Sequence, residues 1–271
     1  MKLCGLSALQ IAGARSLIAG LFLLAVVRQA RRRPTRRMML AVAAYAGTVI
    51  LFVLANKLTT SANTIFLQSA APFYLLLLGP WLLKERVRQA DLIVLGAMAA
   101  GLACVFLGTV PPTRTALDPA LGNLLALASG VAWAFIIIGL RWLGRAEAAA
   151  GHRPPSPATA VVLGNILAGL VNLPFALPVV SFTATDVATV LFLGVVQVGV
   201  AYVLLSRALT RVGALEASLL LMVEPALNPF WSWLIHGEAP GTWSLLGGGM
   251  ILGATALKSA LDRRPRQPVT T

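Results

Sequence analysis

The chain has 271 residues, of which 58% are hydrophobic and 11% are charged, whereas about 25% of the residues in soluble globular domains carry charge. This composition excludes a soluble protein. The net charge of +13 does not indicate nucleic-acid binding, because the basic residues lie in short segments between apolar runs. The two cysteines, Cys4 and Cys104, lie far apart and outside any metal-binding spacing, so no disulfide, metal site or cofactor is expected.

Apolar segments of helix length recur along the whole sequence. In chain order they cover residues 6–27, 38–55, 62–83, 90–110, 122–140, 158–177, 187–206, 213–235 and 243–261. Each is close to the ~20 residues with which an α-helix crosses ~30 Å of hydrocarbon. Arg15 and Asn165 interrupt the first and sixth segments. The sequence therefore predicts an all-α polytopic membrane protein with nine transmembrane helices.

The lysines and arginines between these segments indicate how the chain is oriented. Successive connections alternate between many and few basic residues, and the two sides sum to 18 and 2. The positive-inside rule assigns the basic side to the cytoplasm. We therefore expect a multi-pass protein of the plasma membrane with a cytoplasmic tail at 262–271, and nine helices then leave the N-terminus outside.

The sequence contains a weak internal repeat with an offset of 153 positions. This offset relates Pro72 to Pro225, Glu85 to Glu238 and Gly96 to Gly249. Glu85 falls in a basic connection, whereas Glu238 falls in one without basic residues, so the two copies lie in opposite senses across the membrane. The sequence thus predicts two inverted repeats, at 1–110 and 122–261, which is an arrangement typical of secondary transporters.

Two stretches carry a family resemblance. They are SANTIFLQSAAPFYLLLLGPWLLKERVRQADLIVLGAMAAG and GALEASLLLMVEPALNPFWSWLIHGEAPGTWSLLGGGMILG. In each, a central proline is followed by a glutamate and then by a glycine at the same spacing. This pattern resembles the drug/metabolite transporter superfamily, in particular its EamA family. Arg15, in GARSLIAGLFLL, is similar to the arginine near the start of that family's second helix, and GNLLALASGVAWAF is similar to the opening of its second repeat.

The resemblance implies ten helices in two five-helix repeats, and export or exchange of small metabolites such as amino acids. The offset of 153 places the counterpart of segment 122–140 before Met1. We therefore expect either that one helix of the family plan is absent or that the reading frame begins further upstream.

Glu224 is the leading candidate for the substrate site. It lies near the middle of its apolar segment, where a carboxylate is costly and usually functional, although a packing glutamate is the alternative. Pro225 and Pro229, and Pro72 in the other half, remove backbone donors and leave carbonyl groups that need partners, unless each proline only kinks its helix. Free carbonyls beside a carboxylate favour a zwitterionic or cationic metabolite, with a proton on Glu224 as the suggested exchange partner.

Polar and aromatic side chains elsewhere in the apolar segments are expected to line the substrate path. They are Gln68, Tyr74, Trp133, Gln197, Tyr202 and Asn228, with Asn63, Asn165 and Asn172 as further candidates. The alternative for each polar residue is a hydrogen bond between helices. Glu216 is expected to form an interfacial ion pair, and Glu85 and Glu238 to close their repeats. His152 and His236 lack a second ligand at metal spacing, so both are interpreted as surface residues.

The function that the sequence favours is secondary transport by alternating access between the two repeats. The alternatives are a non-transporting membrane subunit and a membrane enzyme. Against an enzyme, the chain shows no His cluster, no phosphate-binding Gly-Lys loop and no Ser/His/Asp set, so no catalytic residue is assigned. The expected partners are a small-molecule substrate, the lipid bilayer and protons, but not nucleic acid, and a homodimer is left open.

Overall fold

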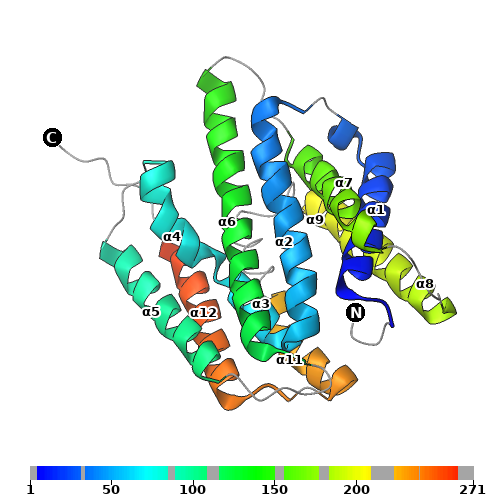
Figure 1. The fold of residues 1–271 in the computed structure, drawn as a ribbon. Helices are drawn as coiled ribbons and strands as arrows, with labels where there is room; N and C mark the ends of the chain where they lie inside the picture. Colours follow the sequence, from blue (N-terminus) through cyan, green and yellow to red (C-terminus); the bar gives the residue numbers. More distant parts are fainter. Residues whose placement is uncertain are drawn as a thin grey trace.

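The computed structural model describes residues 5–31, 34–84, 89–108, 116–149, 156–176, 183–208, 223–237 and 239–261. Regular structure in these ranges is helical (Figure 1). The helices are α1 (Ala8–Val26), η1 (Arg28–Arg31), η2 (Arg36–Met38), α2 (Met39–Leu58), α3 (Ser61–Ser69), α4 (Ala71–Leu82), α5 (Gln89–Leu107), α6 (Pro119–Ala149), α7 (Pro157–Ala176), α8 (Ala184–Leu191), η3 (Phe192–Val200), α9 (Ala201–Ala208), α11 (Val223–His236) and α12 (Thr242–Leu261).

Among the described residues, eight helical segments are long and apolar enough to cross a membrane. They coincide with eight of the nine predicted segments, which confirms the all-α polytopic membrane class. The remaining segment, 213–235, is described only from Val223 onward, as α11. Several residues with predicted roles lie outside the described ranges: Cys4, Glu85, His152, Glu216, Glu238 and the tail 262–271.

One helix is longer than its hydropathy indicates. α6 continues to Ala149, nine residues beyond the predicted end of the fifth segment at 140. The added sequence RWLGRAEAA is rich in alanine, arginine, leucine and glutamate, which favour a helix in water as well as in lipid. Hydropathy therefore detected the membrane-spanning part of α6 but not its polar extension.

The third span consists of two helices. α3 ends at Ser69 and α4 begins at Ala71, while Ala70 between them has φ −74° and ψ 8°. Pro72 lies in the first turn of α4, where its missing N–H group costs no intrahelical hydrogen bond. The chain turns tightly here, since the Phe73 N–H donates to the Ala70 carbonyl at 2.8 Å. The break falls near the middle of the span.

The seventh span is irregular in another way. Between α8 and α9 it follows a π-helix, η3, over Phe192–Val200. π-helical turns are rare in proteins, and those that occur often lie at functional sites. Gly194 and Gly199 let η3 approach α1 closely, because a Cβ at Gly194 would lie 2.7 Å from Cγ2 of Ile18 and one at Gly199 would clash with the Phe22 ring.

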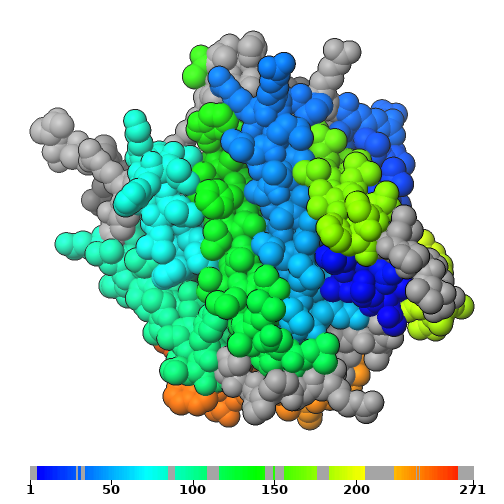
Figure 2. Space-filling model, viewed as in Figure 1, coloured from blue at the N-terminus to red at the C-terminus, as the bar shows by residue number. Residues whose placement is uncertain are grey.

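The helices pack as one bundle with α2 and α6 at its centre in the view of Figure 1. α2 contacts α6 and α7, α1 contacts α7 and η3, and α6 also contacts α3 and α4. α5 pairs with α12 on the other flank, and α11 lies against α3 and α12. Figure 2 shows α6 and α2 side by side on the viewed face. Large apolar side chains point outward, as at Trp81, Leu107 and Phe175, which suits a bundle surrounded by lipid.

α5 and α12 approach each other more closely than side chains would permit. A Cβ at Gly101 would lie 2.8 Å from the carbonyl oxygen of Gly247, and a Cβ at Gly247 would clash with the carbonyl oxygen of Gly101. Small residues that bring helix backbones together are a common basis of helix association in membranes. Nζ of Lys258 on α12 lies 2.9 Å from Oδ1 of Asp91 on α5, so an ion pair joins the helices as well.

A buried network fixes the start of α6 against the turn between α2 and α3. Oδ1 of Asn123 accepts hydrogen bonds from Thr59 Oγ1 at 2.8 Å and from Asn63 Nδ2 at 3.2 Å. Gly130, seven residues after Asn123, lies on the same face of α6, where a Cβ would be 3.0 Å from the Leu67 carbonyl oxygen. This contact sets the register of α6 against α3, and so positions the polar residues described next.

Candidate functional site

Polar side chains from six helices lie inside the bundle, near the middle of their spans. We call them the central polar cluster: Arg15 of α1, Tyr45 and Thr48 of α2, Gln68 of α3, Tyr74 of α4, Ser129 of α6 and Asn165 of α7. The hydrocarbon centre offers no water to such groups, so each needs a partner from protein or ligand. A cluster of this kind is therefore the first place to look for a substrate site.

One half of the cluster is a hydrogen-bonded chain across three helices. Gln68 Nε2 donates to Ser129 Oγ at 2.8 Å, and Ser129 Oγ donates to the Thr48 carbonyl at 3.1 Å. Tyr74 is buried beside this chain with its hydroxyl unpartnered. Gly130 makes room for both neighbours, because a Cβ there would lie 3.0 Å from Tyr74 Cε2 and 3.3 Å from Gln68 Cα.

The other half surrounds a buried cation. Arg15 is 5% exposed and lies within electrostatic range of Tyr45. Asn165, which is 1% exposed, donates from Nδ2 to the Tyr45 hydroxyl at 3.1 Å and to the Val161 carbonyl at 2.9 Å. Arg15 Nε and Asn165 Oδ1 have no hydrogen-bond partner among the described residues. This half thus holds one unsatisfied donor and one unsatisfied acceptor.

The two halves meet on α2. Tyr45 and Thr48 are three residues apart on this helix, and side chains at that spacing are neighbours on its surface. α2 packs between α7 and α6. Tyr45 contacts Asn165 of α7 in the cationic half, and the Thr48 carbonyl contacts Ser129 of α6 in the hydrogen-bonded half. α2 therefore contributes to both halves, through the Tyr45 hydroxyl to one and through the Thr48 backbone carbonyl to the other.

The charge of Arg15 is not balanced by an acid in the part of the chain that the structure describes. Asp91 pairs with Lys258, and the Asp118 carboxylate accepts from the Leu121 N–H. Asp186 completes the capping box of α8, and Glu224 is exposed on α11. A charged side chain in the middle of a bilayer is expensive and is usually functional. The cluster offers a guanidinium and a phenol to an incoming polar group, and it offers no set of groups for acid–base or nucleophilic catalysis.

The predicted site residues occupy different environments. Gln68 and Tyr74 lie together in the central polar cluster. Tyr202 packs among apolar residues of α1 and α7, including Leu23 and Val162. Trp133 is 42% exposed, and the side chains of Gln197 and Glu224 are exposed in this conformation. The substrate-binding roles assigned to these residues remain predictions.

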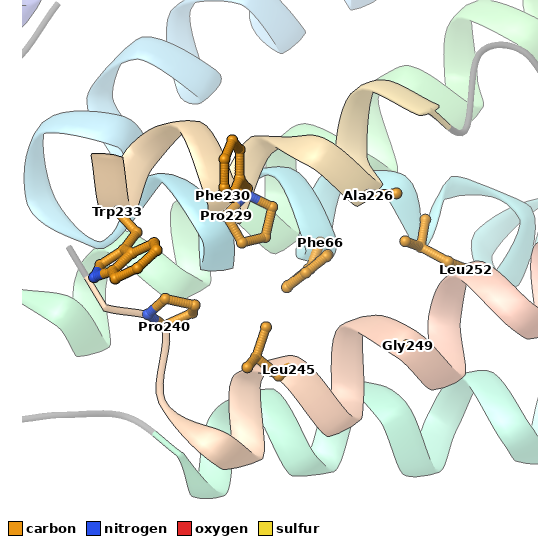
Figure 3. Close-up of a pocket in the computed structure, with 9 residues that line it drawn as sticks. All are labelled: Phe66, Ala226, Pro229, Phe230, Trp233, Pro240, Leu245, Gly249 and Leu252. Carbon is orange, nitrogen blue, oxygen red and sulfur yellow. The ribbon is translucent and has the colours of Figure 1, made fainter. Parts of the chain in front are cut away.

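α11 contributes to an apolar pocket of about 380 Å³ (Figure 3). The pocket lies between α3, α11 and α12, and its lining residues are Phe66, Ala226, Pro229, Phe230, Trp233, Pro240, Leu245, Gly249 and Leu252. Of the predicted site residues, only Pro229 lines it. Pro225 is buried, and Asn228 is partly buried with its Oδ1 unpartnered. Because none of the described lining residues is charged, the pocket suits a hydrocarbon group better than a polar metabolite.

Sequence reasoning missed three members of the central polar cluster: Tyr45, Thr48 and Ser129. Each stands in an apolar run where a hydroxyl is also compatible with ordinary helix packing, so no local signal distinguishes it. Arg15 was interpreted as an interruption of the first segment and as similar to an arginine of the family, and no site role was assigned to it. Its position as a charge inside an apolar span was a signal in its own right, because such residues mark functional sites.

Comparison with known proteins agrees with this architecture. The model of the EamA-like transporter family matches residues 1–107 and 120–260. The chain belongs to the EamA-like transporter family. The uncharacterized transporter YdfC of Bacillus subtilis (strain 168) is 34% identical to this EamA protein over 96 residues, which are 35% of this chain and 31% of that protein. The chain thus matches about a third of the length of this curated relative.

A solved crystal structure of a protein has the same fold as this EamA protein. The two superimpose with a TM-score of 0.62 at 21% sequence identity, over 98% of this chain and 92% of the other. At this identity the likeness concerns the fold alone. It supports the helix arrangement from which the central polar cluster was identified.

Proposed function

We propose that this EamA protein is a secondary transporter of the plasma membrane that exports or exchanges a small zwitterionic or cationic metabolite, such as an amino acid. The observation that carries the proposal is the central polar cluster, buried at mid-membrane beside a broken helix. In secondary transporters, substrate sites lie near the bilayer midplane at the interface of two repeats and beside discontinuous helices. The break between α3 and α4 provides such a discontinuity.

The cluster also draws on both predicted repeats. Arg15, Tyr45, Thr48, Gln68 and Tyr74 come from residues 1–110, whereas Ser129 and Asn165 come from residues 122–261. A substrate held between the repeats is exposed to one side or the other when the repeats rock, which is the principle of alternating access. Because no nucleotide-binding motif is present in the sequence, an ion gradient, the membrane potential or exchange of substrates would drive transport.

The charges favour a zwitterion among the proposed substrates. Arg15 disfavours a simple cation in the cationic half of the cluster, since like charges in a low dielectric repel strongly. A carboxylate is attracted there, while Glu224 on α11 is available to an amine or a proton. An α-amino acid carries both complementary groups.

Counterflow in proteoliposomes tests the proposed function. The purified chain is reconstituted into vesicles preloaded with an unlabelled mixture of the standard amino acids, and uptake of the same mixture carrying radiolabel is measured. We expect uptake well above that of protein-free vesicles. Folded, correctly inserted protein that moves none of these solutes in either direction would contradict the proposal and favour a non-transporting subunit.

A further inference from the structure

We propose that Arg15, Tyr45 and Asn165 form a subsite for the carboxylate of the transported metabolite. This inference rests on the proposed function, because it assigns one end of the substrate to one half of the central polar cluster. Its starting point is the charge of Arg15, which no acid among the described residues balances. Replacing water around a guanidinium with hydrocarbon and uncharged side chains costs free energy that only an anion offsets fully.

Two groups of this half can donate to an anion: the buried Arg15 guanidinium and the Tyr45 hydroxyl, which lies within electrostatic range of it. Arg15 Nε is buried without a partner, and a guanidinium offers its N–H groups in a planar fork that matches the two oxygens of a carboxylate. The Tyr45 hydroxyl already accepts a hydrogen bond from Asn165 Nδ2 at 3.1 Å, so its own proton is directed to another acceptor. Asn165 thus orients Tyr45, and Arg15 and Tyr45 contact the anion.

The chemistry of these groups selects a carboxylate. One guanidinium and one phenol match a single negative charge spread over two oxygens. A phosphate dianion would leave a charge unbalanced, because no second cation of the described residues joins the cluster. An uncharged amide could accept the same hydrogen bonds but would leave the charge of Arg15 uncompensated. Discrimination between an acid and its amide is therefore the signature of this subsite.

The burial of the subsite implies that a bound anion stabilises the closed conformation. Arg15 and Asn165 are 5% and 1% exposed, so the described conformation covers them. An anion reaches them only when α1, α2 and α7 separate, and it then stabilises the closed arrangement by balancing the charge. A ligand that binds the folded but not the unfolded state raises the thermal midpoint, and the rise continues with the logarithm of the ligand concentration above the dissociation constant.

Thermal unfolding of the full chain in lipid nanodiscs tests the assignment. The probes are L-alanine, L-serine, L-leucine and L-lysine, each compared with its carboxamide. We expect at least one acid to raise the midpoint, its amide to have little effect, and Arg15→Gln to weaken the acid's apparent affinity about tenfold or more, as for loss of a charge-assisted contact. Arg141→Gln, an exposed arginine on α6, is the matched control and should behave as wild type.

A second experiment tests the subsite without any added substrate, through the thermal midpoint of the ligand-free protein. Asn165→Asp places a carboxylate next to Tyr45, in the same half of the cluster as Arg15, and in the proposed subsite it should raise the midpoint of the ligand-free protein more than in the Arg15→Gln background. The double-mutant comparison isolates the Arg15–carboxylate interaction. Equal destabilisation by Asn165→Asp in both backgrounds, or equal stabilisation of wild type by acid and amide, would overturn the subsite. Unchanged counterflow by the Arg15→Gln variant would also overturn the subsite, but it would leave the proposed function intact. Absence of counterflow by the wild-type protein would instead contradict transport itself.

Discussion

Two ionisable residues in apolar spans occupy contrasting environments. Arg15 is enclosed by α1, α2 and α7, whereas the Glu224 side chain is exposed on α11. The difference gives them different expected roles. A covered charge acts by holding a ligand within the closed conformation, and an accessible carboxyl group acts by taking up a proton or a substrate amine. Variants of the two residues should therefore differ in their consequences for transport.

Glu224→Gln is expected to insert and fold normally but to lose transport, or to lose the dependence of transport on pH. Glutamine keeps the shape of the side chain and removes its ability to carry charge or a proton. The measurement is counterflow at equal amounts of reconstituted protein across about pH 5 to 8. A variant that transports at the wild-type rate throughout this range would make Glu224 a packing residue.

Ser129→Ala is expected to weaken both stability and transport. The change removes the acceptor of Gln68 and the donor to the Thr48 carbonyl, and a buried polar group left unsatisfied costs about 1–3 kcal/mol. Interhelical hydrogen bonds in membranes are often worth less, so the thermal midpoint should fall modestly. Thr255→Ala is the control, because its hydroxyl donates to the Ile251 carbonyl of its own helix. Equal behaviour of the two variants would show that the chain across three helices is dispensable.

At the scale of helices, hydropathy predicted most of the fold. Each described span lies within a few residues of a predicted segment, because crossing the bilayer requires an apolar helical segment of about 20 residues. The central polar cluster could not be predicted in the same way. Whether Tyr45 meets Asn165 depends on which faces of α2 and α7 pack together, and that is decided by contacts between distant segments. The π-helical stretch of η3 likewise has no signal in the sequence that we recognised.

The break between α3 and α4 yields a prediction about an element. Pro72→Ala restores a backbone donor and permits a continuous helix, so the thermal midpoint should hold or rise. Transport should fall nonetheless, because a continuous helix would move Tyr74 relative to the rest of the central polar cluster. Counterflow and thermal unfolding are measured on the same preparation. Unchanged transport in a variant of unchanged stability would mean that Pro72 only shapes the helix.

At the scale of the whole molecule, the charge pattern predicts the orientation. The C-terminus, residues 28–37 and residues 84–88 should face the cytoplasm, while Thr113 and Ala184 should lie outside. Single cysteines at Thr113 and Ala184, in chains lacking Cys4 and Cys104, should react with a membrane-impermeant maleimide added to intact cells. Cysteines at Arg36 or Lys84 should react only after the membrane is permeabilised. Labelling of Arg36→Cys in intact cells would reverse the assignment.

The backbone contact between α5 and α12 resists relative movement of these two helices. The two helices touch at Gly101 and Gly247 and are joined again by Lys258 and Asp91, so sliding one past the other would force a clash or break an ion pair. α5 ends the first predicted repeat and α12 ends the second. In the proposed alternating-access cycle, we expect this pair to act as a fixed pivot between the two predicted repeats, with the opening on the opposite flank of the bundle, where α1 packs against α7 (Figure 1).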